Sequence, residues 1–562
     1  MLARAYNIIY LLLLAAILVI FGCKKETPVE KADLVLLNGN IVTMNKELPR
    51  AQAVAMRGNT IVKVGHNKNV NPFIGEETTV VDLEKKLVIP GLIDAHIHPF
   101  GVGRALASAA LDLRGLTKEQ ILDKVAQRVK EVKKGEWITG KGWDQAFFKE
   151  KKYPTRYDLD SVAPDNPVAL SPVYGHSSWY NSLALRLSNI DKNTKDPEGG
   201  RIFRDEQGEP TGILAEKAQS LIKRERRRYG AGPEERENYI KLAMEQFKKW
   251  GLTGIHDAGA DRGSLELYEE LKRKGELTVR IYAMISASGD VFSEYLGQGP
   301  QVDDFLTARS MKVFIDGALG PQGALLFEPY ADAPDTSGLQ MLKEEEAYSI
   351  VKRSLDNGFQ VCTHAIGDKG IHIVLNLYQR ALEENPVKDH RFRIEHASVI
   401  HPDDLPRFKE LNVVASMQPI FLGEYGRWSE NRLGPQRAKN VLPFRQLLDA
   451  GVIIAGGTDY TSSDSGNPIE NFYTAVTRKS PYGVSEEWQG QEKITREEAL
   501  RMLTLDAAYA AFEEDIKGSI EPSKLADLVV LSQDIMNVDG DEILNTEVLM
   551  TILDGKIIYS KE

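Results

Sequence analysis

The chain has 562 residues, of which 42% are hydrophobic and 27% are charged. This composition excludes a disordered or fibrous protein. Acidic residues outnumber basic ones by 81 to 70, and the net charge of −11 gives no sign of the basic face that a nucleic-acid-binding protein needs. The two cysteines, Cys23 and Cys362, are too few to form a disulfide framework.

The N-terminus predicts a targeting segment. An apolar run over residues 8–21 is shorter than the roughly 20 residues that span a bilayer. It ends at Gly22 and Cys23, and this ending resembles a bacterial lipoprotein cleavage site. The resemblance implies a signal peptide over residues 1–22, a lipid on Cys23 and a tether over residues 23–31. An uncleaved anchor helix is the alternative. Both place the protein in the cell envelope, attached to a membrane on its periplasmic or extracellular side.

Both ends of the remaining chain have β-strand patterns. Short β-branched runs separated by Asn-Gly or Gly-Asn turns predict hairpins, for example where residues 38–40 connect the first two runs. The same pattern returns in residues 526–559. Neither end has enough strands for a stable sheet core. We therefore expect one composite β-sandwich domain made of residues 32–88 and 520–562.

The middle of the chain alternates between short apolar runs and amphipathic stretches. Eight runs are candidate strands: residues 92–95, 254–255, 279–286, 311–315, 359–363, 392–395, 413–416 and 452–455. Strand followed by helix, repeated eight times, predicts an α/β protein with a (β/α)₈ TIM-like barrel over residues 89–519. About 150 residues separate the first two strands, far more than a helix crossover needs. We expect residues 104–228 to form an inserted lid or substrate subdomain over the barrel mouth.

The strongest chemical signal is the sequence PGLIDAHIH at residues 90–98. Side chains two positions apart on a strand point the same way, so His96 and His98 aim two imidazoles at one point. They end the first barrel strand, where barrel enzymes have their active sites. Two imidazoles suit a borderline metal such as zinc. The pattern predicts a metal site, with packing or surface histidines as the alternative.

PGLIDAHIH resembles the signature of the amidohydrolase superfamily, whose members are metal-dependent hydrolases with a barrel and a composite β-domain. Later segments resemble its YtcJ-like branch, also called amidohydrolase family 3. The resemblance extends from residue 32 to residue 559. Within the insertion it rests on residues 142–144, 175–177, 197–200 and 208–212.

The resemblance implies three further metal ligands. His364 matches the ligand of strand five, His396 that of strand six, and Asp459 the aspartate of strand eight, which also shuttles the proton. The residue positions agree with this assignment, because each of the three ends a candidate strand. A core histidine satisfied by other contacts is the alternative for His364 and for His396.

Lys312 resembles the strand-four lysine that the family carboxylates with CO₂. A protonated amine has no lone pair, so an unmodified Lys312 is not a ligand. A lysine carbamate is an anionic oxygen donor, and burial favours the loss of the proton that precedes it. The resemblance implies two divalent cations, expected to be zinc, and a carbamate on Lys312. The alternative is a single cation, with Lys312 paired to Asp316.

The expected partner is a small-molecule substrate, and a homo-oligomer stays open. His176 in the insertion is a candidate for substrate contact, with a structural turn as the alternative. Trp143 and Tyr174 are candidates for lining the pocket, although packing inside the insertion is the commoner fate of such aromatic residues. Loops at this face of a barrel carry specificity.

The expected reaction is hydrolysis of a non-peptide C–N bond in an amide, a formamide-like group or a cyclic amide. Water activated by the metal attacks the carbonyl-type carbon. Asp459 takes the proton and passes it to the leaving nitrogen. One alternative is an esterase or organophosphate hydrolase that uses the same site. The other is a lipoprotein that binds a ligand without catalysis, but six filled ligand positions argue against it.

Overall fold

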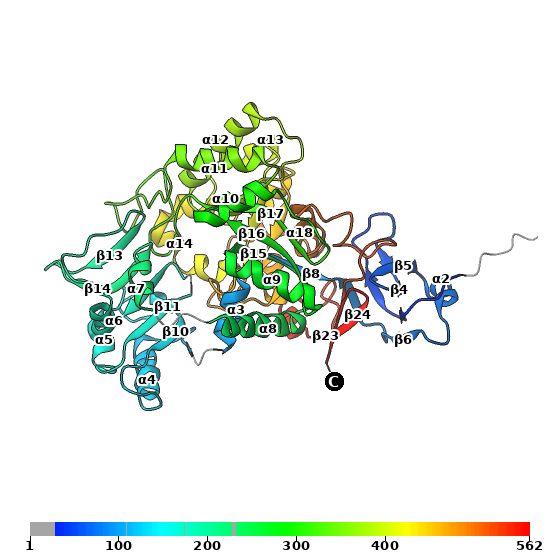
Figure 1. Ribbon diagram of the computed structural model, residues 1–562, viewed down its shortest axis with the longest axis horizontal. Coiled ribbons are helices and arrows are strands. Elements are labelled where there is room, and N and C mark those ends of the chain that lie inside the picture. The colour runs from blue at the N-terminus through cyan, green and yellow to red at the C-terminus, as the bar shows by residue number, and fades with distance from the viewer. Residues whose placement is uncertain (1–28, 108–109, 174, 227–231, 562) are drawn as a thin grey trace, which may run out of the picture.

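The computed structural model describes residues 29–107, 110–173, 175–226 and 232–561. The expected signal peptide, Cys23 and Tyr174 lie outside these ranges. Within them, no helix combines the length and the apolar character needed to cross a membrane. The barrel occupies the centre of the molecule, with the insertion on one side and the β-sandwich on the other (Figure 1).

Eight parallel strands form the barrel, in chain order around it. They are β8 (Leu92–Ile97), β15 (Leu252–Ala260), β16 (Arg280–Ser286), β17 (Leu306–Phe314), β18 (Gln360–Ala365), β19 (Arg393–His396), β20 (Val414–Met417) and β21 (Ile454–Gly456). All eight expected strands are present, and the predicted barrel fold is confirmed.

Asp94 on β8 connects the first and last strands of the barrel. Its carboxylate accepts hydrogen bonds from the backbone N–H of Thr458 (3.0 Å) and from the Thr458 hydroxyl (2.6 Å), just beyond β21. Gly457 permits the close approach, since a Cβ at this position would lie 2.5 Å from the backbone nitrogen of His96. The closure therefore brings His96 next to the residues that follow β21.

Helices cover the outside of the barrel and extend from its ends. They are α3 (Pro99–Ala107), α8 (Pro233–Lys249), α9 (Arg262–Lys274), α10 (Gly289–Gln298), α11 (Glu344–Asp356), α12 (Asp368–Glu384), α13 (Leu405–Glu410), α14 (Leu422–Arg437), α15 (Phe444–Asp449), α16 (Pro468–Thr477), α17 (Arg496–Met502) and α18 (Leu505–Ala510). Helix α8 shows why they form: it starts with Pro233 and acidic residues and ends with lysines, as the helix dipole favours.

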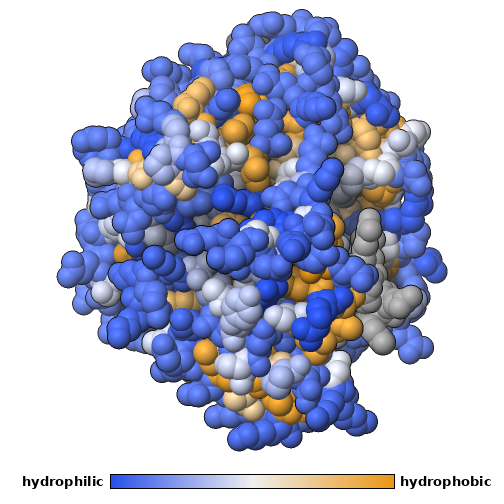
Figure 2. Space-filling model, turned by 90° about the vertical axis from the view of Figure 1, so that its left-hand side faces the viewer, coloured by the Kyte–Doolittle hydropathy of each residue, from blue (hydrophilic) through white to orange (hydrophobic). Residues whose placement is uncertain are grey.

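The insertion between β8 and β15 is built on a six-stranded sheet, in the order β13-β14-β12-β11-β10-β9. Its elements are β9 (Leu111–Asp112), α4 (Lys118–Val129), β10 (Ile138–Trp143), α5 (Arg156–Asp160), β11 (Val168–Pro172), β12 (Ser177–Tyr180), α6 (Ser182–Leu187), β13 (Gly200–Arg204), β14 (Pro210–Glu216) and α7 (Gln219–Arg226). Arg104, the expected first residue of the insertion, lies within α3, which packs against α8. The face that the insertion presents is largely hydrophilic, with scattered apolar patches (Figure 2).

Two sheets enclose a separate apolar core on the other side of the barrel. The first contains β5 (Thr60–Gly65), β4 (Ala53–Arg57), β1 (Leu34–Leu37) and β6 (Thr79–Asp82), and α2 (Asn67–Val70) follows β5. The second contains β24 (Lys556–Ser560), β23 (Val548–Leu553), β22 (Leu528–Leu531), β7 (Leu87–Pro90), β2 (Asn40–Val42) and β3 (Arg50–Ala51). Because β22 pairs with β7, the two ends of the chain share one sheet.

The hairpin predicted at residues 38–40 is wrong. Strand β1 pairs with β4 and β6, whereas β2 pairs with β3 and β7, so these consecutive strands belong to different sheets. Asn38 has a φ of 57°, and the chain crosses here from one sheet to the other. The crossing places Leu36 and Ile41 in the same core. Burial of both apolar runs therefore outweighs the local preference for a hairpin.

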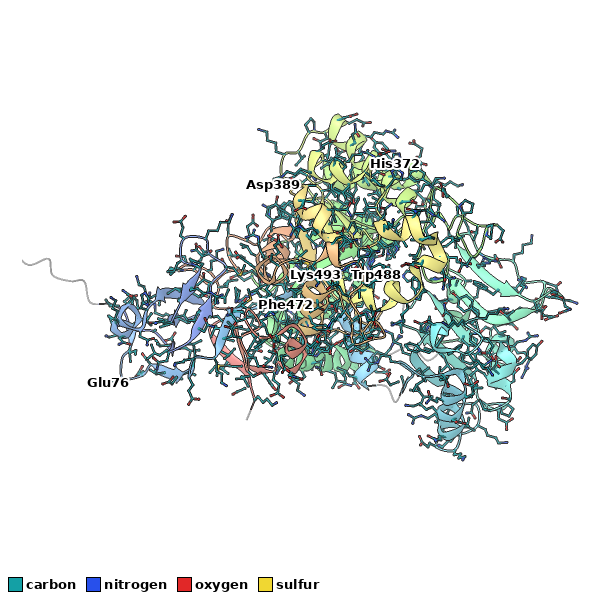
Figure 3. All side chains as sticks on the ribbon, turned by 180° about the vertical axis from the view of Figure 1, so that it is seen from behind. Glu76, His372, Asp389, Phe472, Trp488 and Lys493 are labelled. Carbon is teal, nitrogen blue, oxygen red and sulfur yellow. The ribbon has the colours of Figure 1, made fainter. Side chains whose placement is uncertain are left out.

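A buried ion pair fastens the β-sandwich to the barrel. Arg280 begins β16 and is 1% exposed, and its guanidinium lies 2.7 Å from Asp527 and 3.1 Å from Asp554. Seen from behind, Glu76 in the loop before β6 lies at the end of the molecule opposite the insertion (Figure 3). The β-sandwich therefore sits on the side of the barrel away from the insertion.

Candidate metal centre and substrate pocket

Three buried side chains from different strand ends meet at the carboxyl-terminal end of the barrel. His96, His396 and Asp459 each offer a ligand atom, and these atoms lie within 4.8 Å of one another. Backbone hydrogen bonds from Asp459 N–H to His96 O (2.6 Å) and from His98 N–H to Tyr460 O (3.0 Å) hold two of the segments together. His396 and Asp459 have positive φ values, 76° and 56°. Such strained residues cluster at functional sites.

His98 and His364 flank this group. His98 Nε2 lies 3.0 Å from Asp459 Oδ1, and the His98 side chain is 34% exposed. The ring of His364 lies 4.5 Å from that of His396, between centroids. Buried His364 Nε2 has no hydrogen-bond partner among the described residues. An unsatisfied buried nitrogen beside two other imidazoles fits a metal ligand, because most buried polar atoms in proteins are paired.

Neighbouring side chains orient two of the imidazoles. His96 Nδ1 lies 2.5 Å from Glu395 Oε2, and His396 Nδ1 lies 2.9 Å from Gln418 Oε1. Both rings therefore keep Nε2 for a metal, the arrangement seen around metal-binding histidines. Burial lowers the pKa of His96 to about 4, and the positive charge of Lys312 adds to the effect. The imidazole is neutral at physiological pH, which is the form that binds a metal.

Glu395 is a functional residue that the sequence analysis missed. It is fully buried, and it lies 2.8 Å from the guanidinium of Arg393, two residues earlier on β19. The signal was present in the sequence, because alternate residues of a barrel strand face the interior. An acidic residue at such a position needs a buried partner. Here the partners are Arg393 and His96.

Lys312 is buried on β17, beside the same group. Its Nζ lies 4.8 Å from the centre of the Phe314 ring. Burial lowers the pKa of Lys312, which favours the neutral amine that reacts with CO₂. The alternative pairing with Asp316 is wrong: no ion pair joins the two among the described side chains. The Asp316 carboxylate instead accepts hydrogen bonds from the backbone N–H groups of Leu325, Ile366 and Gly367.

The insertion places His176 over the metal centre. His176 Nδ1 lies 3.0 Å from Glu216 Oε2, and its ring centroid is 5.6 Å from that of His364. A small cavity lies between the insertion and the barrel, lined among others by His176, Leu319, His396, Phe421, Glu424 and Asp459. His176 therefore lines a cavity in which the expected contact with a substrate could form.

The expected position of Trp143 in the pocket is wrong. Its side chain is fully buried in the core of the insertion, against Phe148 and Trp179. Its indole N–H donates to the backbone oxygen of Leu170 at 2.8 Å. The packing alternative holds because the sheet of the insertion needs large side chains to fill its own core.

Comparisons with known proteins agree with this geometry. The sequence model of the amidohydrolase family matches residues 79–559. The chain is 32% identical to "Putative amidohydrolase YtcJ" of Bacillus subtilis, over 93% of this chain and 98% of that protein. It is 30% identical to "N-substituted formamide deformylase" of Arthrobacter pascens, over 94% and 98%. An uncharacterized metal-dependent hydrolase from Pyrococcus horikoshii superposes with a TM-score of 0.73 at 27% identity, covering 90% of this chain and 99% of that one.

The chain therefore belongs to the amidohydrolase family, and the expected resemblance to the YtcJ-like branch is confirmed. It is a metal-dependent hydrolase that acts on carbon–nitrogen bonds.

Proposed function

We propose that the protein hydrolyses the C–N bond of a small amide, formamide-like or cyclic amide substrate, with Asp459 as the acid–base residue. The observation that carries the proposal is the convergence of ligand atoms from His96, His396 and Asp459 at the carboxyl-terminal rim of the barrel. A relative that covers nearly the whole chain is named for deformylation of N-substituted formamides, which is a reaction of this class.

The proposed metal ligands are His96, His98, His364, His396 and Asp459, together with a carbamate on Lys312. We propose two divalent cations, with zinc as the expected element, because imidazole and carboxylate donors suit it. When bound, the cations would supply Lewis-acid activation of water and of the substrate carbonyl.

In this proposal, Asp459 moves the proton. Its Oδ1 lies 3.0 Å from His98 Nε2 and 3.6 Å from His96 Nε2. The same oxygen is buried and has no hydrogen bond of good geometry among the described residues. A carboxylate oxygen that is free to accept a proton from water and deliver it to the leaving nitrogen fits the acid–base role.

In this proposal, His176 holds the substrate. Glu216 occupies its Nδ1, so Nε2 remains for the cavity. Burial lowers the pKa of His176, but the charge and hydrogen bond of Glu216 together with the charges of Asp459 and Asp316 outweigh it, and the pKa is raised. A partly protonated imidazole donates well to a substrate carbonyl oxygen.

The direct test is formate release from N-benzylformamide by the zinc-loaded protein, with p-nitrophenyl acetate as a competing ester. Turnover of the formamide with a kcat/KM well above that of the ester supports the proposal. Faster cleavage of the ester, or formate release that persists after the metal is removed by a chelator, would contradict it.

We also propose that the protein is a lipoprotein anchored through Cys23. The strands that follow the expected tether belong to the β-sandwich, on the side of the barrel away from the insertion (Figure 1). Incorporation of an alkyne-labelled fatty acid into the protein, and its loss in Cys23→Ser, tests the anchor. Equal labelling of the two proteins would refute it.

A further inference from the structure

Besides His176, the insertion brings a lysine side chain close to the candidate metal ligands. Lys141 lies on β10, and its Nζ is buried without a hydrogen-bond partner among the described residues. The nitrogen lies 5.4 Å from the centre of the Tyr460 ring, directly after Asp459 in the sequence. Burial lowers the pKa of Lys141, whereas the charge of Asp459 acts in the opposite direction. Lys141 therefore reaches the segment after β21 that carries Asp459 and Tyr460.

Two arginine side chains of the same region, Arg427 and Arg114, are already paired with carboxylates. Arg427 on α14 lies 2.6 Å from Asp144, and Arg114 lies 2.8 Å from Asp112. Both arginines make additional hydrogen bonds to backbone oxygens. Lys141 differs from them, because no ion pair within the described part of the chain uses its ammonium group. A buried charge without a counter-ion is costly, so it indicates a site that a ligand completes.

Two buried carboxyl groups of this region, Glu424 and Asp464, form no ion pair with Lys141 among the described residues. Glu424 Oε1 and Asp464 Oδ2 are buried and have no hydrogen-bond partner among the described residues. Burial raises the pKa of Asp464 to about 7 and that of Glu424 well above its usual value, so these groups tend to hold protons. Glu424 also lines the cavity beside His396 and Asp459. Lys141 is therefore a basic group without a partner among the described residues, and the carboxyl groups of this region repel an anion weakly.

We infer that Lys141 binds a carboxylate group of the substrate, so that the natural substrate is an amide or formamide that bears a carboxylate. This inference rests on the proposed function, since it concerns the substrate of the same site. A single ammonium suits a carboxylate better than a phosphate, because neither arginine fork beside it is free. The carboxylate would pair with Lys141, and the scissile bond would lie near Asp459.

The test compares two formamides that differ only in this group, N-formyl-L-phenylalanine and N-(2-phenylethyl)formamide. The wild type is expected to have a kcat/KM at least about 30-fold higher for the carboxylated compound, as truncation of buried charge pairs suggests. In Lys141→Met this ratio should fall to near one, and Lys141→Arg should retain part of it. Lys133→Met, at an exposed lysine of the same insertion, is the matched control and should keep the wild-type ratio. A wild-type ratio near one, or an unchanged ratio in Lys141→Met, would overturn the inference.

A binding measurement separates this inference from the proposed function. Zinc-loaded Asp459→Asn is titrated with each compound by calorimetry, alone and with Lys141→Met added. Tighter binding of the carboxylated compound that depends on Lys141 supports the inference, even if the wild type releases no formate. In that case only the proposed reaction fails. Equal affinities for the two compounds in Asp459→Asn would overturn the role of Lys141.

Discussion

Two buried polar clusters at opposite ends of the barrel differ in how well their atoms are satisfied. At the β-sandwich junction, the Arg280 guanidinium donates to Asp527, to Asp554 and to the backbone oxygen of Asp304. At the other end, His364 Nε2 and Asp459 Oδ1 are buried without a hydrogen bond among the described residues.

The difference shows how a barrel divides stability and chemistry between its ends. The junction cluster lies where strand β16 begins, and its complete pairing makes it a structural joint. The rim cluster lies where strands end, which is where barrel enzymes bind their ligands. A bound metal or substrate would supply the partners that its unsatisfied atoms lack. Variants at each cluster should therefore affect different properties.

The largest effect is expected for Asp459→Asn. The amide keeps the shape of the side chain but accepts no proton, so kcat should fall about 1,000-fold. Zinc content and the midpoint of urea unfolding should stay close to those of the wild type. Asp515→Asn, at an exposed aspartate, is the control for the charge change. A fully active Asp459→Asn enzyme would remove Asp459 from the mechanism.

Arg280→Met tests the junction, where we expect a loss of stability without a loss of activity. Removal of the guanidinium leaves Asp527 buried and unpaired, which should lower the free energy of unfolding by about 3–5 kcal/mol. The folded fraction should keep its zinc content and its kcat, because the rim is untouched. Arg273→Met, at an exposed arginine, should change neither property. Loss of kcat in folded Arg280→Met protein would show that the two ends are coupled.

Glu395→Gln should weaken metal binding, and it should also lower the free energy of unfolding because buried Arg393 loses its counter-charge. Glutamine occupies the same space but orients the His96 ring less strongly, so zinc should bind about 10–100-fold more weakly. Competition with a fluorescent chelator measures the dissociation constant. Glu410→Gln, at an exposed glutamate, serves as the matched control. Equal zinc affinity in Glu395→Gln and wild type would mean that Glu395 serves only Arg393.

Trp143→Phe should have the smallest effect. Loss of the indole hydrogen bond and of some packing should lower the stability by about 1–3 kcal/mol. The KM for the substrate should not change, because Trp143 lies inside the core of the insertion. A raised KM without a loss of stability would indicate that Trp143 lines the pocket.

The sequence predicted the barrel well because each of its strand–helix units has a recognisable local pattern. Each strand is an apolar run followed by a helix, and His96 on β8 ends such a run. The hairpin at residues 38–40 failed for the opposite reason, since strand pairing there depends on a core shared by residues far apart in the chain. Side chains of the insertion were equally hard to assign. Whether an aromatic residue such as Trp143 faces a cavity or a core depends on packing that local sequence does not encode.

The rim residues followed from the family resemblance, but their supporting partners did not. Glu395 stands directly before His396 in the sequence, and its role depends on contact with His96 across the barrel. Lys141 was hidden for a similar reason. Its position beside the Tyr460 ring is set by how the insertion folds over the barrel, which no pattern on β10 reveals.

The central claim is that the rim of the barrel binds divalent cations, and metal content per chain tests it most directly. Elemental analysis of purified protein should find about two zinc ions per chain, as in two-metal sites of this kind. The His96→Asn/His396→Asn double variant should stay folded and bind far less. A mild mass measurement of the Lys312 peptide should also show the added CO₂. A folded wild-type protein that holds no metal after growth and dialysis with zinc would contradict the account.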